Sequence, residues 1–544
     1  MFEVTKREGS ARTGIFSEGE LILNTPCVID TTETFPSLGS MTYSNVPLYA
    51  DGEFCERFLE QQGEFFISHP ASPEGVKADS GAAVMVPNWH TVITDPRNYV
   101  KWILDMKTRH PPDTMWYAPA SALPSNVATL IASGFDLFDY TAVDLKTSQG
   151  IFCNPDGEYP AEDYLNCGTC GCEGCLKGDL KLHNRIALEL EIAKIILRIK
   201  EGTVREYLEK QSLNAPNLVS ILRFFDREYK FAESSTPVAR PIRLYTNSGD
   251  SINRPEIKRF MQRVVSRYIP SRTDAAVILP CSARKPYSSS QSHRKYMGAI
   301  RDRAHEIILT SPLALVPREL EGVYPAGHYD VPVTGYWDME ERNIIGKVVE
   351  DYFTKNRYEQ VFVHLEGDAA IIAKDALERA GIEPIFTATG NSPTSHDSIR
   401  NLEKAMAGLP RKSHNYIRGM LSWQFGVDVD TSGMIIKGRF GNRKVLKKKT
   451  QLFSIENETG LYRPTFEGWE HLDGHYTVEI DDFVPQGDIL APGVIGCDPE
   501  IRPGDEVFVK GSKAIATGRA SMGSEEMIGS KRGVAVKVRK VKEI

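Results

Sequence analysis

The stretch DAAVILPCSARKPYSSSQSHRKYMGAIRDRAHEIIL, Asp274–Leu309, decides the fold of the middle of this chain. Its first residues, DAAVIL (Asp274–Leu279), form an apolar run that predicts a buried strand. Its last residues, RKYMGAIRDRAHEIIL (Arg294–Leu309), have the spacing of an amphipathic helix. A strand, a polar loop and a helix start in this order are typical of an α/β domain, and ligands commonly bind where such a strand ends. The loop is therefore the first candidate for a functional site.

The loop PCSARKPYSSSQSH, Pro280–His293, concentrates side chains that can do chemistry. A thiol is a nucleophile, and an amine or an imidazole can move a proton, so Cys281, Lys285 and His293 are candidate catalytic residues. The candidate substrate-binding residues of the loop, which offer hydroxyl groups, are Ser282, Tyr287 and Ser290. The alternative interpretation is a serine-rich helix cap that contains a buried cysteine.

The segments after this loop predict a doubly wound α/β domain over residues 233–395. The predicted strands are Leu313–Leu320, Glu359–Leu365 and Glu383–Thr389, and the predicted helices are Glu340–Asn356 and Asp368–Gly381. A sheet built in this way carries helices on both faces and binds ligands at the carboxyl ends of its strands. Two further loops should therefore converge on the Cys281 loop, namely Pro317–Asp338 and the HLEG segment with His364 and Glu366.

Length, charge and composition limit the other possibilities. The chain of 544 residues allows for roughly three to five domains. The net charge of −7 does not by itself indicate a nucleic-acid binder. No apolar run approaches the roughly 20 residues that span a bilayer, and the N-terminus lacks the apolar core of a signal peptide. We therefore expect a cytoplasmic protein without a membrane contact, in which nine cysteines do not form a disulfide framework.

Four of these cysteines lie within nine residues, in CGTCGCEGCLKGDLKLHN (Cys167–Asn184). The spacing C-x2-C-x-C-x2-C-x7-H predicts a metal site, because clustered thiolates and a downstream histidine can close on one tetrahedral zinc ion. All positions would be filled by protein side chains, so the zinc would be structural. An iron–sulfur cluster is the alternative, and the nearby histidine favours zinc.

The first third of the chain alternates helix-like and strand-like segments, which predicts a parallel sheet or barrel. The helix-like segments Asn98–His110 and Pro124–Gly134 precede the short run FDLFDY, Phe135–Tyr140. Asp139 stands at the end of that run, and an aspartate at the carboxyl end of a barrel strand is a catalytic candidate. A helix cap or a salt bridge is the alternative role.

The stretch ASGFDLFDYTAVDLKTSQGIFCNPDGE (Ala132–Glu158), together with the cysteine cluster, resembles the archaeal tRNA-guanine transglycosylases. The resemblance implies a (β/α)8-type barrel, here reduced and spanning residues 1–232, with an inserted zinc site. The implied zinc ligands are Cys170, Cys172, Cys175 and His183, which leaves Cys167 as a spare thiol. It also implies that Asp139 is the nucleophilic aspartate and that Asp79, in ADSGAAV, stands where the family has its second aspartate. The second Gly, the Phe and the Gln of the family's motif are missing after Asp79.

The pattern PCS-x2-KPY-x2-S-x2-H, which matches Pro280–His293, resembles the archaeosine synthases. That family acts on tRNA that carries 7-cyano-7-deazaguanine at position 15 of the D-loop. The resemblance implies that an amine, reported as lysine, adds to the nitrile to give an amidine, and that a radical-SAM partner protein then produces archaeosine. The relatives are dimers, so a homodimer is implied as well.

The loop residues fit this reaction. A thiolate of Cys281 can add to the nitrile to give a thioimidate, which an amine then displaces. Lys285 and His293 can favour the thiolate and move the proton, and the dipole of the following helix favours an anion. Direct attack of the lysine amine on the nitrile, with Asp139 or His293 as base, is the competing mechanism.

The last part of the chain predicts contacts with RNA. KGRFGNRKVLKKK, Lys437–Lys449, lies in a predicted small α+β domain (396–470) and is either a phosphate-binding segment or a solvated edge. Residues 471–544, with DPEIRPGDEVFV, ATGRA and KRGVAVKVRK, resemble a PUA domain, a small RNA-binding β-barrel. The candidate RNA-binding residues are Lys437, Arg439, Arg443, Lys444, Arg519, Lys531 and Arg532.

These observations predict a multidomain α/β protein with three possible functions. The first is an enzyme that transfers an amine to a nitrile-bearing tRNA base. The second is a non-catalytic subunit that binds tRNA for a partner. The third is an active transglycosylase. The reactive groups around Cys281 favour the enzyme, because a binding scaffold does not need them.

Overall fold

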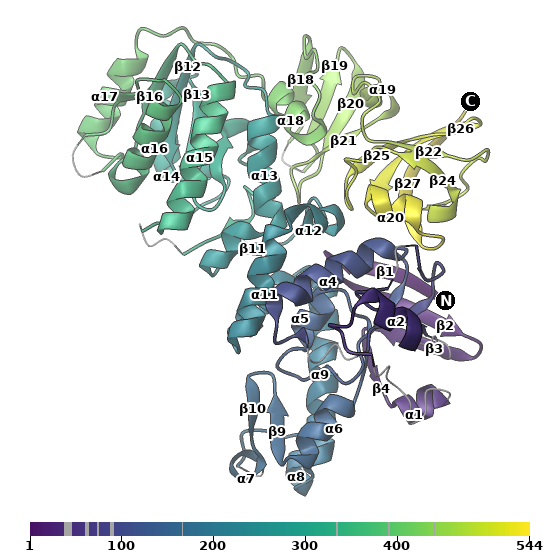
Figure 1. Cartoon of the computed structure of the whole chain (residues 1–544). Helices are drawn as coiled ribbons and strands as arrows, with labels where there is room; N and C mark the ends of the chain where they lie inside the picture. Colours follow the sequence, from purple (N-terminus) through teal and green to yellow (C-terminus); the bar gives the residue numbers. More distant parts are fainter. Residues whose placement is uncertain are drawn as a thin grey trace. The chain divides into compact units, whose positions relative to one another are not determined.

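The computed structural model describes residues 1–544 apart from 37–45, 60–64, 73–74, 88–91, 166, 333–335, 390–391 and 440. The chain forms two compact units, shown in Figure 1. One unit contains Met1–Pro237 together with Val478–Ile544, and the other contains Val238–Thr477. Within the described ranges, no helix combines the length and the apolar character that a bilayer-spanning segment needs.

The unit Val238–Thr477 is built on a five-stranded sheet with the order β14-β13-β12-β16-β17. The strands are β12 (Ala275–Pro280), β13 (His305–Thr310), β14 (Ala314–Pro317), β16 (Gln360–Val363) and β17 (Ile385–Phe386). All neighbours pair in parallel except β14, which runs antiparallel to β13 at the edge. The chain leaves central β12 toward β13 and later crosses to β16 on its other side. This reversal at β12 is the topological switch point at which α/β sheets bind ligands.

Helices cover both faces of this sheet, as the doubly wound prediction requires (Figure 1). They are α13 (Pro255–Ser266), α14 (Gln291–Ile300), α15 (Met339–Lys355), α16 (Gly367–Arg379) and α17 (His396–Met406). Helices α14 and α17 pack together over the alternate β12 residues Ala275, Val277 and Leu279. Because successive side chains of a strand point to opposite faces, buried Ala276 and Ile278 face the other layer.

One predicted element is wrong. The segment Arg294–Leu309 was expected to form a single helix, but α14 ends at Ile300 and β13 begins at His305. Arg301 and Asp302 have left-handed backbones with φ of 49° and 57°, which stop the helix. Every residue of β13 is buried, as expected of a strand that is covered on both faces. Such a strand has no alternation of buried and exposed positions that would distinguish it from a helix in the sequence.

The same unit also contains a small α+β part. Its antiparallel sheet has the order β18-β19-β20-β21. The elements are α18 (Tyr416–Phe425), β18 (Met434–Lys437), β19 (Lys444–Lys447), β20 (Thr450–Ile455), β21 (Tyr462–Pro464) and α19 (Phe466–Trp469). The basic segment that begins at Lys437 lies on the β18–β19 hairpin, although Phe440 at its tip is outside the described residues.

The other unit begins with an antiparallel sheet and continues with a parallel one. Strands β1 (Phe2–Glu8), β2 (Ala11–Glu18) and β3 (Leu21–Thr25) form the first sheet. The parallel sheet has the order β4-β8-β7-β6-β5. Its strands are β4 (Cys27–Ile29), β5 (Phe66–Ile67), β6 (Ala83–Met85), β7 (Met115–Tyr117) and β8 (Leu137–Asp139). The first parallel strand pairs with the last, as in a barrel, and closure of the ring stays a prediction.

Helices surround this parallel sheet and continue beyond it. They include α4 (Pro96–Arg109), α5 (Val127–Ala132), α6 (Thr141–Ser148), α9 (Leu180–Glu201), α10 (Val204–Ser212), α11 (Pro216–Arg227) and α12 (Tyr229–Ser235). Between α6 and α9 lie the hairpin of β9 (Ile151–Asn154) and β10 (Gly157–Pro160) and the short helices α7 (Ala161–Tyr164) and α8 (Glu173–Lys177). The predicted helices Asn98–His110 and Pro124–Gly134 correspond to α4 and α5.

The C-terminal segment forms a six-stranded sheet with the order β23-β27-β26-β25-β22-β24. The strands are β22 (Thr477–Ile480), β23 (Ile489–Leu490), β24 (Val494–Cys497), β25 (Glu506–Lys510), β26 (Ala514–Ala520) and β27 (Val534–Glu543), with α20 (Ser524–Gly529) before the last strand. This segment packs on the N-terminal part of its unit. Arg502 Nε donates to Glu233 Oε2 at 2.6 Å, and the backbone N–H of Lys531 donates to Asp113 Oδ2 at 2.9 Å.

A buried ion pair joins the two N-terminal sheets. Arg12 of β2 donates from Nε and Nη2 to the two carboxylate oxygens of Asp136, at 2.9 and 2.7 Å. The backbone N–H of Trp116 donates to the same carboxylate at 2.9 Å. Both charged side chains are almost fully buried, so each depends on the other for its solvation.

We predict that Arg12→Met destabilises the protein by about 3–5 kcal/mol, because it leaves the Asp136 carboxylate buried without its cation. Urea unfolding followed by hydrogen exchange on β7 and β8 measures the change. The control is Arg418→Met, which removes an exposed partner of Asp428 and should cost less than about 1 kcal/mol. Equal effects of the two changes would contradict this account of the buried pair.

Candidate functional site

Cys281 lies at the switch point, directly after β12. Its thiol is exposed, and it interacts electrostatically with Lys285, Tyr296 and Tyr329. The structure therefore brings two of the predicted catalytic groups, the thiol and the Lys285 amine, to the carboxyl edge of the sheet. This is the edge at which the sequence predicted a site.

Lys285 is held against an aromatic ring. Its Nζ lies 3.8 Å from the centroid of the Tyr329 ring, which is a cation–π contact. Burial lowers the pKa of Lys285, and Arg243 lowers it further, whereas the charges of Cys281 and Asp330 raise it. The net decrease makes the ammonium a better proton donor near neutral pH than a solvated lysine.

The tyrosine beneath Lys285 is fixed by a chain of buried hydroxyls. The Tyr329 hydroxyl lies 2.6 Å from the Tyr287 hydroxyl and 2.6 Å from Thr310 Oγ1. Burial raises the pKa of Tyr287 and that of Tyr329, so both phenols stay neutral. Tyr287, a predicted substrate-binding residue, lies inside the protein and positions the ring on which Lys285 rests.

The two predicted substrate-binding serines, Ser282 and Ser290, form hydrogen bonds with nearby backbone groups. Ser282 Oγ donates to the Arg284 carbonyl at 3.0 Å. Ser290 is the N-cap of α14, and its Oγ accepts from the His293 N–H at 3.2 Å. The helix-cap interpretation therefore describes Ser290, although it does not describe Cys281, which is exposed.

His293 is fully buried and neutral. Its Nδ1 lies 2.9 Å from Arg318 Nη2, and since a guanidinium can only donate, Nδ1 accepts and the proton lies on Nε2. Burial and the Arg318 charge lower the pKa of His293 to about 3, although the Pro280 carbonyl opposes the change. This geometry gives His293 a positioning role and is unsuited to the predicted proton transfer.

Arg318 is the residue that sequence reasoning missed. Its Nε and Nη2 donate to Glu306 Oε2 at 3.0 and 2.5 Å, and its Nη1 donates to Glu321 Oε2 at 2.7 Å. Glu321 Oε2 also accepts from the Ser288 N–H at 2.9 Å. Arg318 thus holds the loop through Ser288 and through His293. An arginine directly after the apolar run of β14 was the available signal.

The HLEG segment reaches the same edge, as predicted, because β16 pairs with β12. His364 Nε2 donates to the Pro393 carbonyl at 2.8 Å, and Thr387 Oγ1 lies 2.9 Å from Nδ1. The ring of Tyr296 packs edge-to-face between His293 and His364, with centroids 5.4 and 5.2 Å away. Arg318, Glu321 and Tyr329 come from the other predicted loop, of which residues 333–335 are outside the described part.

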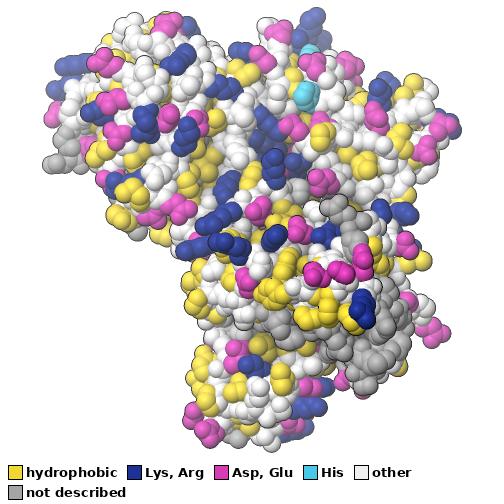
Figure 2. Space-filling model, in the orientation of Figure 1, with side chains coloured by type: hydrophobic (Ala, Val, Ile, Leu, Met, Phe, Trp, Pro, Cys, Tyr) yellow, Lys and Arg dark blue, Asp and Glu magenta, His cyan; other side chains and the backbone are white. Residues whose placement is uncertain are grey.

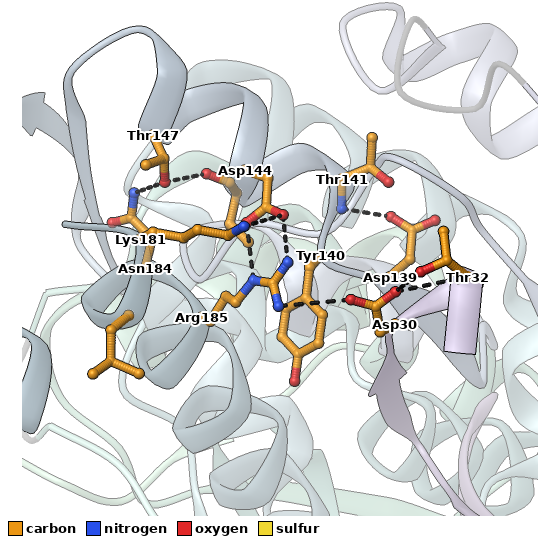
Figure 3. Close-up of polar contacts among 12 residues, drawn as sticks. Asp30, Thr32, Asp139, Tyr140, Thr141, Asp144, Thr147, Lys181, Asn184 and Arg185 are labelled. Carbon is orange, nitrogen blue, oxygen red and sulfur yellow. Dashed lines mark hydrogen bonds and ion pairs between the residues drawn. The ribbon is translucent and has the colours of Figure 1, made fainter. Parts of the chain in front are cut away.

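Asp139 lies in the other unit, at the carboxyl end of β8 as predicted. It is buried, and its carboxylate accepts from the Tyr117 hydroxyl at 2.6 Å, from the Ala120 N–H at 3.2 Å and from the Thr141 N–H at 2.8 Å. Figure 3 shows the contact with Thr141 at the start of α6. These contacts are those of a structural carboxylate that fixes the end of β8.

Asp79 does not lie beside Asp139. It precedes β6, whereas Asp139 ends β8, and these two strands belong to one parallel sheet. The two carboxylates therefore lie at opposite ends of the sheet and do not form one site. The residues after Asp79 serve the packing of the unit instead, because Ser80 Oγ donates to Asp113 at 2.5 Å, and Asp113 also accepts from the Lys531 N–H.

The ligand atoms of Cys170, Cys172, Cys175 and His183 all lie within 4.8 Å of one another. His183 Nδ1 is 3.7, 3.2 and 3.3 Å from the three Sγ atoms in that order. A tetrahedral zinc site with ordinary bond lengths has S···N edges of about 3.5 Å, so the donor set fits such a metal ion. Cys167 is exposed and bonds to the Tyr164 carbonyl and Thr169 instead, which makes it the spare thiol.

The surroundings prepare this cluster for a metal ion. His183 Nε2 donates to the Cys153 carbonyl at 3.0 Å, which leaves Nδ1 free as a ligand. A Cβ on Gly174 would lie 2.2 Å from the backbone nitrogen of His183, so only glycine lets α8 and α9 approach this closely. Burial and the thiols of Cys172 and Cys170 raise the pKa of Cys175 to about 12, and a cation would counteract this increase.

The start of α9 connects the cluster to the edge of the parallel sheet (Figure 3). Asn184, next to the ligand His183, donates to Thr147 Oγ1 of α6 at 2.9 Å. Arg185 pairs with Asp144 of α6 at 2.5 Å and lies 3.7 Å from Asp30, which follows β4. A metal ion at the cluster would therefore also fix the contacts at the carboxyl ends of β4 and β8.

The predicted RNA-binding residues lie on two surfaces. Lys437 and Lys444 stand directly opposite each other on the β18–β19 hairpin, where Arg439 is exposed and Arg443 half-buried. Lys531 and Arg532 are exposed in the C-terminal segment, whereas Arg519 pairs with buried Glu506 at 3.1 Å. Figure 2 shows basic and acidic side chains intermingled on the visible face, so this face does not carry one continuous basic surface.

Comparison with known proteins identifies two family matches. Residues 257–406 match a family described as "Domain of unknown function (DUF5591)", and residues 477–542 match the PUA domain. The first match covers the sheet that carries Cys281, and the second covers the C-terminal sheet.

Full-length relatives extend this result. The chain is 34% identical to "Archaeosine synthase subunit alpha" of Methanosarcina acetivorans and 35% identical to "Archaeosine synthase" of Haloferax volcanii, each over 100% of this chain and 99% of the relative. It is also 24% identical to "tRNA-guanine(15) transglycosylase" of Methanobrevibacter smithii, over 81% of this chain and 68% of that protein. The identity and coverage of the first two show that this chain belongs to the archaeosine synthase family.

Proposed function

We propose that this protein acts in archaeosine biosynthesis, by adding a primary amine to the nitrile of 7-cyano-7-deazaguanine in tRNA. The observation that carries this proposal is the exposed Cys281 thiol beside Lys285 at the switch point of the α/β sheet. Membership of the archaeosine synthase family and the match to the RNA-binding PUA domain support tRNA modification by a transferase. Lysine as the amine, a radical-SAM partner protein and a homodimer follow from the family resemblance alone.

The proposed chemistry proceeds in two steps. The Cys281 thiolate forms a C–S bond to the nitrile carbon, and the nitrile nitrogen takes a proton from Lys285, which gives a neutral thioimidate. The amine then adds to the same carbon, the C–S bond breaks and the thiolate leaves, so the product is the amidine. His293 and Arg318 act indirectly, because they hold the loop in place.

Zinc is the metal ion that we assign to the cluster of Cys170, Cys172, Cys175 and His183, on the basis of its donor set. With all four positions filled by protein ligands, the ion stabilises the fold and does not contact substrate. Its contribution is to order the start of α9 and, through Arg185, the edge that contains Asp30 and Asp144.

The alternative functions receive less support from the geometry. A transglycosylase needs two cooperating aspartates, but Asp79 and Asp139 lie at opposite ends of the sheet. A non-catalytic tRNA-binding subunit has no use for an exposed thiol beside a lysine with a lowered pKa. Among the described residues, no contact specifically favours either the transglycosylase or the non-catalytic tRNA-binding subunit.

We predict that the protein, incubated with lysine and tRNA that carries 7-cyano-7-deazaguanine, gives a nucleoside adduct detectable by mass spectrometry. Cys281→Ala should abolish the adduct, and Lys285→Met should lower the rate about 10²–10⁴-fold by removing the proton donor. Cys497→Ala, a thiol of the C-terminal sheet, is the control. Adduct formation at full rate by Cys281→Ala would exclude the thioimidate, whereas release of the free base would indicate a transglycosylase.

We also predict one tightly bound zinc ion per chain by elemental analysis of the purified protein. Cys172→Ser should lose the ion and unfold at a lower temperature, because α8 and the start of α9 lose their common anchor. Cys167→Ser should keep both the ion and the stability, since its thiol lies outside the cluster. Loss of zinc in the Cys167 variant would show that the ligand assignment is wrong.

A third prediction concerns the β18–β19 hairpin. Like charges directly opposite each other destabilise a sheet, and a bound phosphate would relieve this repulsion between Lys437 and Lys444. Replacing both with Gln should weaken tRNA binding and reduce the slope of log K against log salt by about 2. The matched control replaces Lys347 and Lys374, which pair with acidic neighbours on α15 and α16. An unchanged slope for the hairpin variant would exclude this surface.

A further inference from the structure

Glu366 and Cys281 both lie at the carboxyl edge of the α/β sheet. Strands β12 and β16 pair in parallel, with Ile278 opposite Val363. Cys281 lies three residues after Ile278, and Glu366 lies three residues after Val363, so both follow the paired strands at the same height. The burial-raised pKa of Tyr296 is raised further by the charges of Glu366 and of Cys281, in agreement with their common location.

One carboxylate oxygen of Glu366 is buried without a hydrogen-bond partner among the described residues. Glu366 is the N-cap residue of α16, yet its side chain accepts no capping hydrogen bond. Among the described residues, its buried Oε1 has no hydrogen-bond partner. A buried acceptor without a partner costs free energy, so a group of this kind in a folded protein requires an explanation.

Three of the cations near this edge, Arg318, Arg342 and Lys285, have other contacts. Arg318 binds Glu306 and Glu321, and Arg342 pairs with Asp368 of α16. Lys285 rests on the Tyr329 ring, and the acidic groups that act on it are Cys281 and Asp330. The other carboxylates at this edge are also engaged, because Asp330 pairs with Arg243 at 3.1 Å and Glu341 accepts from Ser311. Among the residues that the structure describes, Glu366 is therefore a half-buried carboxylate without a cationic partner.

We propose that Glu366 binds the primary ammonium group of the amine substrate and takes its proton. This inference rests on the proposed function and assigns the amine subsite to it. An ammonium group supplies both the positive charge and the N–H donor that the buried Oε1 lacks. Glu366 and Cys281 follow adjacent paired strands, so an ammonium group bound by Glu366 lies at the same edge as the carbon that the thiolate holds.

The proton balance of the reaction requires such a group. The amine arrives as R–NH3⁺ and has no free electron pair until it gives a proton to the Glu366 carboxylate. The resulting R–NH2 forms a C–N bond to the thioimidate carbon, and the C–S bond breaks to return the Cys281 thiolate. The product is the amidinium, because the thioimidate N–H and both hydrogens of the neutral amine stay on its two nitrogens. The proton on Glu366 then replaces the one that Lys285 gave to the nitrile nitrogen, so charge and atoms are conserved over both steps.

The test compares L-lysine with 6-hydroxynorleucine, in which a hydroxyl replaces the ε-amine. Binding is measured by calorimetry on the full protein with tRNA that carries guanine at the target position, which cannot react. The wild type should bind lysine about tenfold or more tightly than 6-hydroxynorleucine, because of the charged hydrogen bond. Glu366→Gln should remove this preference, and Glu366→Asp should keep part of it. Glu378→Gln, an exposed change on the same helix, should leave the preference intact.

Activity and folding measurements separate the outcomes. With reactive tRNA, Glu366→Gln should lower kcat/KM for lysine about 10²–10⁴-fold at an unchanged unfolding midpoint. A wild type that forms the adduct while Glu366→Gln keeps the preference for lysine would overturn the inference and leave the proposed function standing. A wild type that shows a Glu366-dependent preference but forms no adduct would overturn the proposed function alone. A wild type without any preference for lysine would overturn the amine subsite.

Discussion

The parallel pairing of β12 with a strand on each side is the constraint on which the site in the α/β unit depends. Parallel neighbours end at the same edge, so the residues at and directly after the ends of β12, β13 and β16 must lie close together. These residues are the Cys281 loop, Thr310 and the segment from His364 to Glu366. The register of these pairs, rather than the loop's own conformation, decides which groups become neighbours of the thiol.

The Cys281 loop is held mainly by residues of other segments. Arg318 contacts His293 directly and Ser288 through Glu321, and the Tyr329 ring packs against the Lys285 amine. Ser282, Tyr287, Ser290 and His293 of the loop make structural contacts, while Cys281 is exposed and the Lys285 amine lies over the Tyr329 ring. A rigid surround of this kind keeps a nucleophile and a proton donor in a fixed relation, which is what covalent catalysis needs.

Sequence reasoning predicted where the Cys281 loop lies in the sheet but not the contacts of its side chains. Periodicity and the strand–loop–helix order were sufficient to predict that Cys281 follows a buried strand. Ligand spacing predicted a metal site among four cysteines and His183, and the family resemblance singled out Cys170, Cys172, Cys175 and His183, whose ligand atoms lie together. The role of His293 could not be read in this way, because it depends on burial and on an arginine 25 residues away along the chain. The segment HEIIL was misread as helix, since a short apolar run has no periodicity that separates a buried strand from a helix.

Chain connectivity has a consequence for the order of folding. The unit that contains Met1–Pro237 also contains Val478–Ile544, so the whole α/β and α+β part is inserted between two pieces of one folded body. Asp113 accepts from Lys531 and Arg502 pairs with Glu233, which are contacts that form only after the end of the chain has been synthesised. Since domains fold as units during synthesis, the inserted part can complete its core on the ribosome while its host still waits for its last strands. The sheet edge that carries Cys281 can therefore form before the body that contains the cluster of Cys170, Cys172, Cys175 and His183 is finished.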